Sequence, residues 1–292
     1  MGSEAPGGRV EKRASRGIYY RPMVVDPLGG TWADRRRVTL PLTGVEIDVV
    51  TEDGAVELIV EAALGGRGGL VVTPNIDHLQ QIFKGSWLGA VYAEADLVVA
   101  DGLPLVWASQ LLGMPLPERV AGSHLLTRLS AQAAENGLPV FMLGGREGAA
   151  EETARRFVQR WPKLDVTGWL CPKVGFERER GGIERICEEV ASAGPAIVFT
   201  GLGAPKQDFL NVRLRRHLPD AWYLGVGGAF DMAAGHVRRA PTWAQRSGLE
   251  WAFRLVQEPG RMARRYLIDD LPFAVHLLAA SAGEGRKPRA GR

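Results

Sequence analysis

The sequence has few of the features that mark secreted, metal-binding or membrane-spanning proteins. It contains two cysteines, Cys171 and Cys187, which form neither a disulfide framework nor a metal-type spacing. Its first 20 residues are polar and glycine-rich, unlike a secretory signal. No apolar run approaches the roughly 20 residues that span a bilayer. These absences predict a protein of the reducing cytosol that does not cross a membrane.

Excess positive charge is absent from most of the chain and concentrated at its C-terminal end. Residues 236–292 carry 11 lysines and arginines against 5 acidic residues, whereas the preceding 235 residues carry 25 against 28. A basic end of this kind fits a phosphorylated substrate, an anionic membrane surface or nucleic acid as its partner.

The 292 residues divide into a body, an appendage and two tails. Residues 1–37 lack periodicity and predict a disordered N-terminal tail. A catalytic core is expected over 38–240, and an arginine-rich helical appendage over 241–283, with helices at about 243–256 and 261–280 that are broken at Pro259. Residues 284–292 predict a second, basic disordered tail.

Short apolar runs alternate with amphipathic segments through the body. Strands are predicted at 45–50, 70–73, 97–100, 140–143, 166–170, 196–200 and 222–226. Helices are predicted from 76, over 103–112, 149–160 and 206–217, and in the remaining gaps. Nearly continuous apolar strands that alternate with helices indicate an α/β fold, in which a Rossmann-like parallel sheet is covered by helices on both faces. The α-helical appendage follows it.

Ligands of such sheets bind beyond the carboxyl ends of the strands, so residues that directly follow a strand are the candidates. The positions at or shortly after the predicted strand ends include Thr73, Asn75, Asp101, Gly144, Gly203, Lys206, Gln207, Gly228 and Asp231. The glycine turns resemble phosphate-binding loops, because glycine permits close approach to backbone N–H groups, although glycine also enters tight turns for steric reasons. Lys206 and Gln207 open the next helix, where they contact a phosphate or sugar hydroxyl or are simply solvated.

Asp101 has two interpretations. As a carboxylate in a cleft it can act as a general base toward a sugar hydroxyl. As the residue before Gly102 and Pro104 it can equally cap the next helix, and the sequence alone favours the cap. Asn75 has the same ambiguity, and Thr73 can be an ordinary strand residue.

The sequence contains no pattern typical of a metal centre. Its five histidines show no ligand spacing, and neither an HExxH run nor an acidic pair placed to hold a metal between phosphates occurs. The sequence therefore favours metal-independent chemistry, in which arginines neutralise a leaving diphosphate. No cofactor is expected.

Six segments together resemble the WecG/TagA/CpsF glycosyltransferases, also called glycosyltransferase family 26. They follow the family's order and cover about 40–270: TPNIDHLQ (73–80), ADGLPLVWASQLLG (100–113), ERVAGSHLL (118–126), FMLGGREGAAEETARRF (141–157), FTGLGAPKQDFL (199–210) and VGGAFDMAAGHVRRAPTWAQRSGLEWAFRLVQEPGRMARRYL (226–267).

The resemblance implies an inverting transfer of a sugar from a UDP-sugar to a polyprenyl-diphosphate-linked saccharide in cell-surface polysaccharide synthesis. The sugar is of the N-acetylmannosamine type, its uronic acid or a hexose. The protein is expected on the anionic inner face of the cytoplasmic membrane, with no nucleic acid as partner, and a homo-oligomer is one alternative for its assembly.

By position, the resemblance assigns Asp101 as the catalytic base, which reverses the preference for a helix cap. Pocket positions match Thr73, Asn75, Arg119 and Gln207, and the arginines expected to meet the diphosphate match Arg239, Arg254 and Arg261. His124 departs from the family, since many members carry Asp there.

Two other classes are weighed against this one. A nucleotide-cofactor oxidoreductase would share the fold, but no GxGxxG follows the first strand with an acidic residue about 20 residues later. A non-enzymatic module that binds lipid or nucleic acid would use the basic C-terminus. Its arginines, however, are interleaved with tryptophan and glutamate instead of forming a free basic patch.

Overall fold

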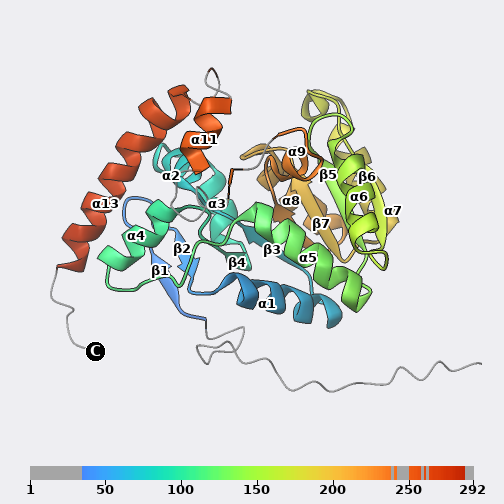
Figure 1. The fold of residues 1–292 in the computed structure, drawn as a ribbon, viewed down its shortest axis with the longest axis horizontal. Coiled ribbons are helices and arrows are strands. Elements are labelled where there is room, and N and C mark those ends of the chain that lie inside the picture. The colour runs from blue at the N-terminus through green and yellow to red at the C-terminus, as the bar shows by residue number, and fades with distance from the viewer. Residues whose placement is uncertain (1–34, 238–239, 242–249, 258–259, 261–262, 287–292) are drawn as a thin grey trace, which may run out of the picture.

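The centre of the protein is a six-stranded parallel sheet. The computed structural model describes residues 35–237, 240–241, 250–257, 260 and 263–286. The sheet has the strand order β4-β3-β8-β7-β5-β6 (Figure 1). In chain order the strands are β3 (Gly69–Val72), β4 (Leu97–Val98), β5 (Val140–Gly144), β6 (Val166–Leu170), β7 (Ile197–Gly201) and β8 (Trp222–Gly225).

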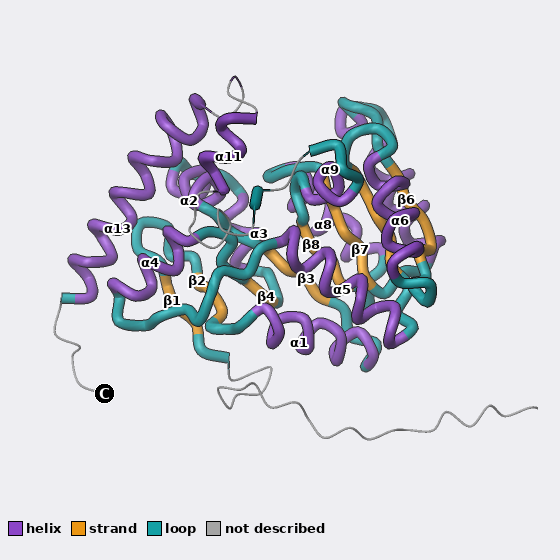
Figure 2. Tube along the Cα trace, in the orientation of Figure 1, coloured by secondary structure: helices purple, strands orange, loops and turns teal. Residues whose placement is uncertain are grey.

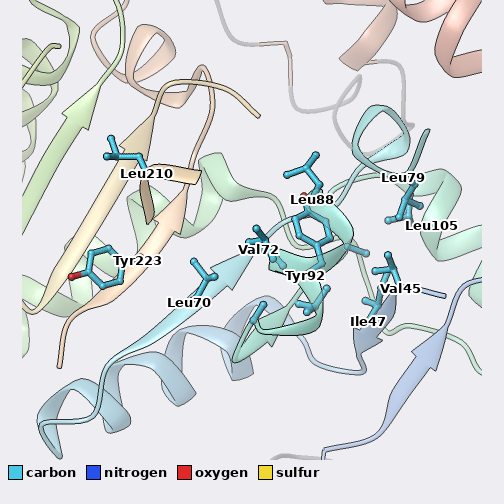
Figure 3. Packing of buried hydrophobic residues seen from close by; sticks show 14 of the residues in the cluster. Val45, Ile47, Leu70, Val72, Leu79, Leu88, Tyr92, Leu105, Leu210 and Tyr223 are labelled. Carbon is cyan, nitrogen blue, oxygen red and sulfur yellow. The ribbon is translucent and has the colours of Figure 1, made fainter. Parts of the chain in front are cut away.

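Helices cover both faces of this sheet, as Figure 2 shows. Successive strand residues point to opposite faces, so Leu70 and Val72 enter one apolar cluster and Val71 enters the other. The Val71 face carries α1 (Glu52–Leu64), α5 (Gly122–Asn136), α6 (Ala149–Arg160) and α9 (Ala229–Ala233). The Leu70 face carries α2 (Ile76–Phe83), α3 (Leu88–Ala93), α4 (Leu103–Leu111), α7 (Gly182–Ala193) and α8 (Lys206–His217). Figure 3 shows part of this packing, with Leu79, Leu88, Leu105 and Leu210 beside Leu70 and Val72. The α/β fold predicted from the sequence is confirmed.

The first predicted strand has a different role from the others. Residues 45–50 were expected among the alternating blocks, but β2 (Glu46–Asp48) pairs antiparallel with β1 (Arg37–Thr39) in a separate hairpin. The hairpin lies beside β4 and meets it through side chains: Asp48 Oδ2 accepts the N–H of Val98 at 2.8 Å, and Arg35 donates to the carbonyl of Asp96 at 2.6 Å. These bonds satisfy backbone groups of an edge strand that would otherwise lack partners.

The helices after the sheet form a separate arm on the side of α4 and α2 (Figure 1). They are α11 (Glu250–Gln257), the π-helix η2 (Arg264–Asp270) and α13 (Leu271–Gly285). The helix predicted over 261–280 therefore runs on to Gly285, and Pro272 stands at the start of α13, directly after η2. Phe273, Leu277 and Ser281 are buried at four-residue spacing and hold α13 against the core.

No helix among the described residues is long and apolar enough to cross a bilayer.

Candidate active site

A cavity of about 550 Å³ opens beyond the carboxyl ends of β3, β4, β7 and β8. The loops after these strands and the start of α5 form its floor. Trp107 of α4, Tyr266 and Leu267 of η2, and Leu271 and Ala274 of α13 form its helical wall. Eight of the residues predicted from the sequence line it: Thr73, Asn75, Asp101, Arg119, Gly203, Gln207, Gly228 and Asp231. The position agrees with the rule for open parallel sheets.

Asp101 lies in the floor, half-buried, where the chain passes from β4 to α4. Its N–H donates to the carbonyl of Pro74 at 2.8 Å, which fixes it beside the loop after β3. The N-cap residue of α4 is Gly102, which has no side chain with which to cap the helix. The prediction that Asp101 is the N-cap residue is therefore wrong, and Asp101 lines the cavity instead.

Asn75 serves as a helix cap and lines the cavity at the same time. Its Oδ1 accepts the N–H of His78 at 3.1 Å, which starts α2. The amide nitrogen of Asn75 is not used in this bond. Thr73, one residue past β3, is buried and lies near Gly122, the first residue of α5. Two polar side chains therefore reach the floor from one strand end.

Gln207 ties two strand ends together. Its side chain is 3% exposed, and its Oε1 accepts the N–H groups of Gly203 at 3.1 Å and Gly227 at 3.0 Å. A side chain at Gly225 would be impossible without rearrangement, because its Cβ would lie 2.4 Å from the Gln207 amide nitrogen. The carbonyl side of Gln207 is thus used inside the protein, and it sets the distance between the turns after β7 and β8.

Two cations and a helix terminus face the cavity from the floor. Arg119 and Arg146 line it, together with Ala121, Gly122 and Ser123 at the start of α5. The N-terminus of a fifteen-residue helix carries partial positive charge and unpaired N–H donors, which favour an anion. Sequence reasoning gave no role to Arg146. Its backbone N–H lies 3.4 Å and its Nε 3.8 Å from Asp231 Oδ1.

A buried polar chain lies behind the floor. His78 lines the cavity, and its Nδ1 lies 2.8 Å from the hydroxyl of Tyr92. Burial, and then the nearby carboxylate of Asp208, raises the pKa of Tyr92 well above its ordinary 10. Burial also raises the pKa of the Asp208 carboxyl from 3.8 to about 7, and its Oδ2 has no hydrogen-bond partner in the described part of the chain.

Two predicted residues lie away from the cavity lining. Gly144 has a φ of 107°, and a Cβ there would lie 2.8 Å from the carbonyl of Gly201, so glycine is needed for packing between β5 and β7. Lys206 contacts Glu177 at 2.9 Å and lies over the ring of Phe176, both in the short helix η1 (Phe176–Arg178).

The three appendage arginines stay predictions. Arg239 and Arg261 lie outside the described residues, and Arg254 belongs to α11 with a side chain that is likewise outside them. Across the part of the chain that the structure describes, no group of three or more histidine, cysteine or acidic side chains is arranged to hold a metal ion.

Two comparisons with known proteins show the family of this chain. Residues 40–287 match the model of the family described as "Glycosyl transferase WecG/TagA/CpsF family". The chain is also 32% identical over 209 residues to the N-acetylglucosaminyldiphosphoundecaprenol N-acetyl-beta-D-mannosaminyltransferase of Bacillus spizizenii strain W23, covering 72% of this chain and 79% of that protein. These matches remove the oxidoreductase and the non-enzymatic binding module as alternatives. The chain belongs to the WecG/TagA/CpsF family and is a glycosyltransferase.

Proposed function

We propose that this enzyme transfers an N-acetylmannosamine-type sugar from a UDP-sugar to a polyprenyl-diphosphate-linked N-acetylglucosamine, in cell-surface polysaccharide synthesis. The observation that carries the proposal is the convergence of Asp101, Asn75 and Arg119 on one cavity at the strand ends. The relative from Bacillus spizizenii supports the sugar and the acceptor, because its name specifies both.

Asp101 is the general base in this proposal. It accepts the proton of the acceptor hydroxyl while that oxygen forms a bond to the anomeric carbon of the donor. The bond from the anomeric carbon to the UDP oxygen breaks on the opposite face, so the configuration inverts. A carboxylate placed in this way contributes about 10²- to 10⁴-fold to the rate.

The leaving UDP gains negative charge as its bond breaks, and the floor offers groups of the opposite sign. Arg119, Arg146 and the N-terminus of α5 face the cavity where such charge would develop. Arg239, Arg254 and Arg261 are proposed to add to this set from the appendage. Loss of activity in Arg254→Ala or Arg261→Ala, with the core still folded, would support that assignment.

The proposal also places the enzyme on the inner face of the cytoplasmic membrane. Its acceptor is embedded there, and α13 carries apolar side chains that are exposed, such as Val275. The C-terminal region 236–292 has 11 lysines and arginines against 5 acidic residues, and a basic region with exposed apolar side chains is suited to an anionic membrane surface. Truncation after Gln245 is expected to release the protein from anionic liposomes, and unchanged liposome binding would contradict this location.

A UDP-release assay tests the reaction. A panel of UDP-sugars is offered with a short-chain polyprenyl-diphosphate-linked N-acetylglucosamine, with and without EDTA, and the glucose-linked acceptor serves as the comparison. Acceptor-dependent release that survives EDTA supports the mechanism and identifies the donor. If the protein does not bind UDP, the proposal is wrong.

A further inference from the structure

The cavity has two sides of opposite character. On the floor side, Arg146 comes from the loop after β5, Gly228 from the loop after β8 and Asp231 from α9, and they present charge and backbone groups. On the other side, Trp107, Leu267 and Leu271 come from the helical wall and present apolar side chains. One ligand that fills such a cavity must be polar at one end and apolar at the other.

The apolar side continues out of the cavity onto the surface. Five large side chains, here called the apolar strip, are exposed over a third to two thirds of their area: Trp107 46%, Leu267 49%, Ile268 66%, Leu271 55% and Val275 60%. The last four lie along η2 and α13: Leu271 follows Leu267 by four residues and Ile268 by three, and Val275 follows Leu271 by four. Helix α13 packs against α4, which carries Trp107 (Figure 1). Exposed apolar side chains that gather in this way mark a binding surface.

Asp101 and the strip meet in the same cavity. Trp107 lies in α4, the helix that begins two residues after Asp101, and both residues line the cavity. An acceptor whose hydroxyl lies at Asp101 can therefore extend within this cavity from the reacting atoms to Trp107.

We propose that the apolar strip binds the first isoprene units of the acceptor lipid, which rests on the proposed function. The acceptor then leaves the cavity over α4 and α13, and the nucleotide lies at the opposite side, toward Arg146 and Asp231. The strip fits this occupant because three of its members line the cavity itself. A surface that met only bulk membrane would not need to reach the site.

The test uses two soluble acceptors with the same N-acetylglucosamine diphosphate head, one carrying three isoprene units and one carrying a methyl group. The full-length enzyme is assayed without vesicles. The wild type should show a KM at least tenfold lower for the prenyl acceptor. Ile268→Asn combined with Val275→Asn, two strip residues outside the cavity lining, should raise that KM about tenfold, with kcat and the KM of the methyl acceptor unchanged.

Leu64→Asn is the matched control, since Leu64 is as exposed as the strip but lies at the end of α1. It should change neither KM. An equal loss on both acceptors, or no loss on either, would overturn the proposal. In a parallel assay with vesicles, a loss that appears only there would also overturn the proposal, because it would show that the strip contacts the membrane instead of the acceptor.

A binding measurement separates this proposal from the proposed function. If no donor supports transfer to either acceptor, the function has failed, and titration with a three-isoprene prenyl diphosphate still tests the strip. The double variant should then bind about tenfold more weakly than the wild type and the Leu64→Asn protein. Equal binding by all three would overturn the strip assignment.

Discussion

The floor of the cavity and its helical wall are held in place by different forces. In the floor, hydrogen bonds fix individual atoms: Gln207 bonds two turns, Asn75 caps a helix, and Asp101 bonds the neighbouring loop. In the wall, α13 is held by a line of buried side chains such as Leu277, and its outer residues remain exposed. Fixed atoms suit chemistry at a single bond, whereas an exposed apolar surface selects by contact area.

The largest effect is expected in the floor, at Asp101. Asp101→Asn keeps the size of the side chain but removes the base, so turnover should fall about 10³-fold. UDP binding should stay within about twofold, which titration calorimetry measures alongside the initial rate. Near-normal turnover would show that the position of Asp101 in the floor does not reflect a role as base.

The Asp208→Asn variant tests whether the carboxyl group of Asp208, buried behind the floor, is neutral in the folded protein. The raised pKa of this carboxyl means that the folded state binds the proton more tightly, so this stabilisation is complete below pH 3.8 and lost as pH rises toward 7. The free energy of unfolding of Asp208→Asn, relative to wild type, should therefore increase with pH over this window, by something on the order of 4 kcal/mol. Denaturant titrations at several pH values measure it.

Asp220→Asn is the control for that series, because Asp220 is exposed. It should track the wild type at every pH. A flat difference between Asp208→Asn and wild type would mean that Asp208 is ionised in the folded protein throughout.

Leu277 tests how the wall is attached. The side chain is fully buried, and Leu277→Ala should lower the free energy of unfolding by about 2–5 kcal/mol. Val275→Ala, two residues away on the exposed side, should change it by less than about 0.5 kcal/mol. Equal effects in denaturant unfolding would show that the two faces of α13 are not as different as their exposure indicates.

The smallest effect is expected at Lys206. Its ion pair with Glu177 is partly exposed, and pairs of this kind contribute about 0–1 kcal/mol. Lys206→Ala should keep turnover within about twofold in the UDP-release assay. A loss above tenfold would restore the earlier expectation that Lys206 contacts the substrate.

The sequence predicted those parts of the site that follow directly from strand ends. Thr73, Asn75, Asp101 and Gln207 each come after or near a short apolar run, and parallel strands bring such positions together. Neighbouring helical residues point about 100° apart, so Gln207 faces the cavity while Lys206 does not, and sequence alone did not separate them.

Contacts between distant segments were beyond sequence reasoning. Arg146 and Asp231 lie 85 residues apart, and Asp208 looks in sequence like an ordinary acidic residue in a helix first turn. Its burial depends on how α8 packs beside α3, which no local pattern encodes. The β1–β2 hairpin was missed for a related reason, because the sequence of a short apolar strand does not determine which strand it pairs with.

The way in which β1 and β2 meet the sheet has a practical consequence for handling the protein. The edge of β4 is closed by the side chains of Asp48 and Arg35 instead of by another strand. Shortened forms that begin after Asp48 would keep every strand of the sheet and uncover this edge right beside Asp101. Such forms should self-associate through β4, visibly in light scattering, and a trimmed N-terminus would then be mistaken for a natural dimer.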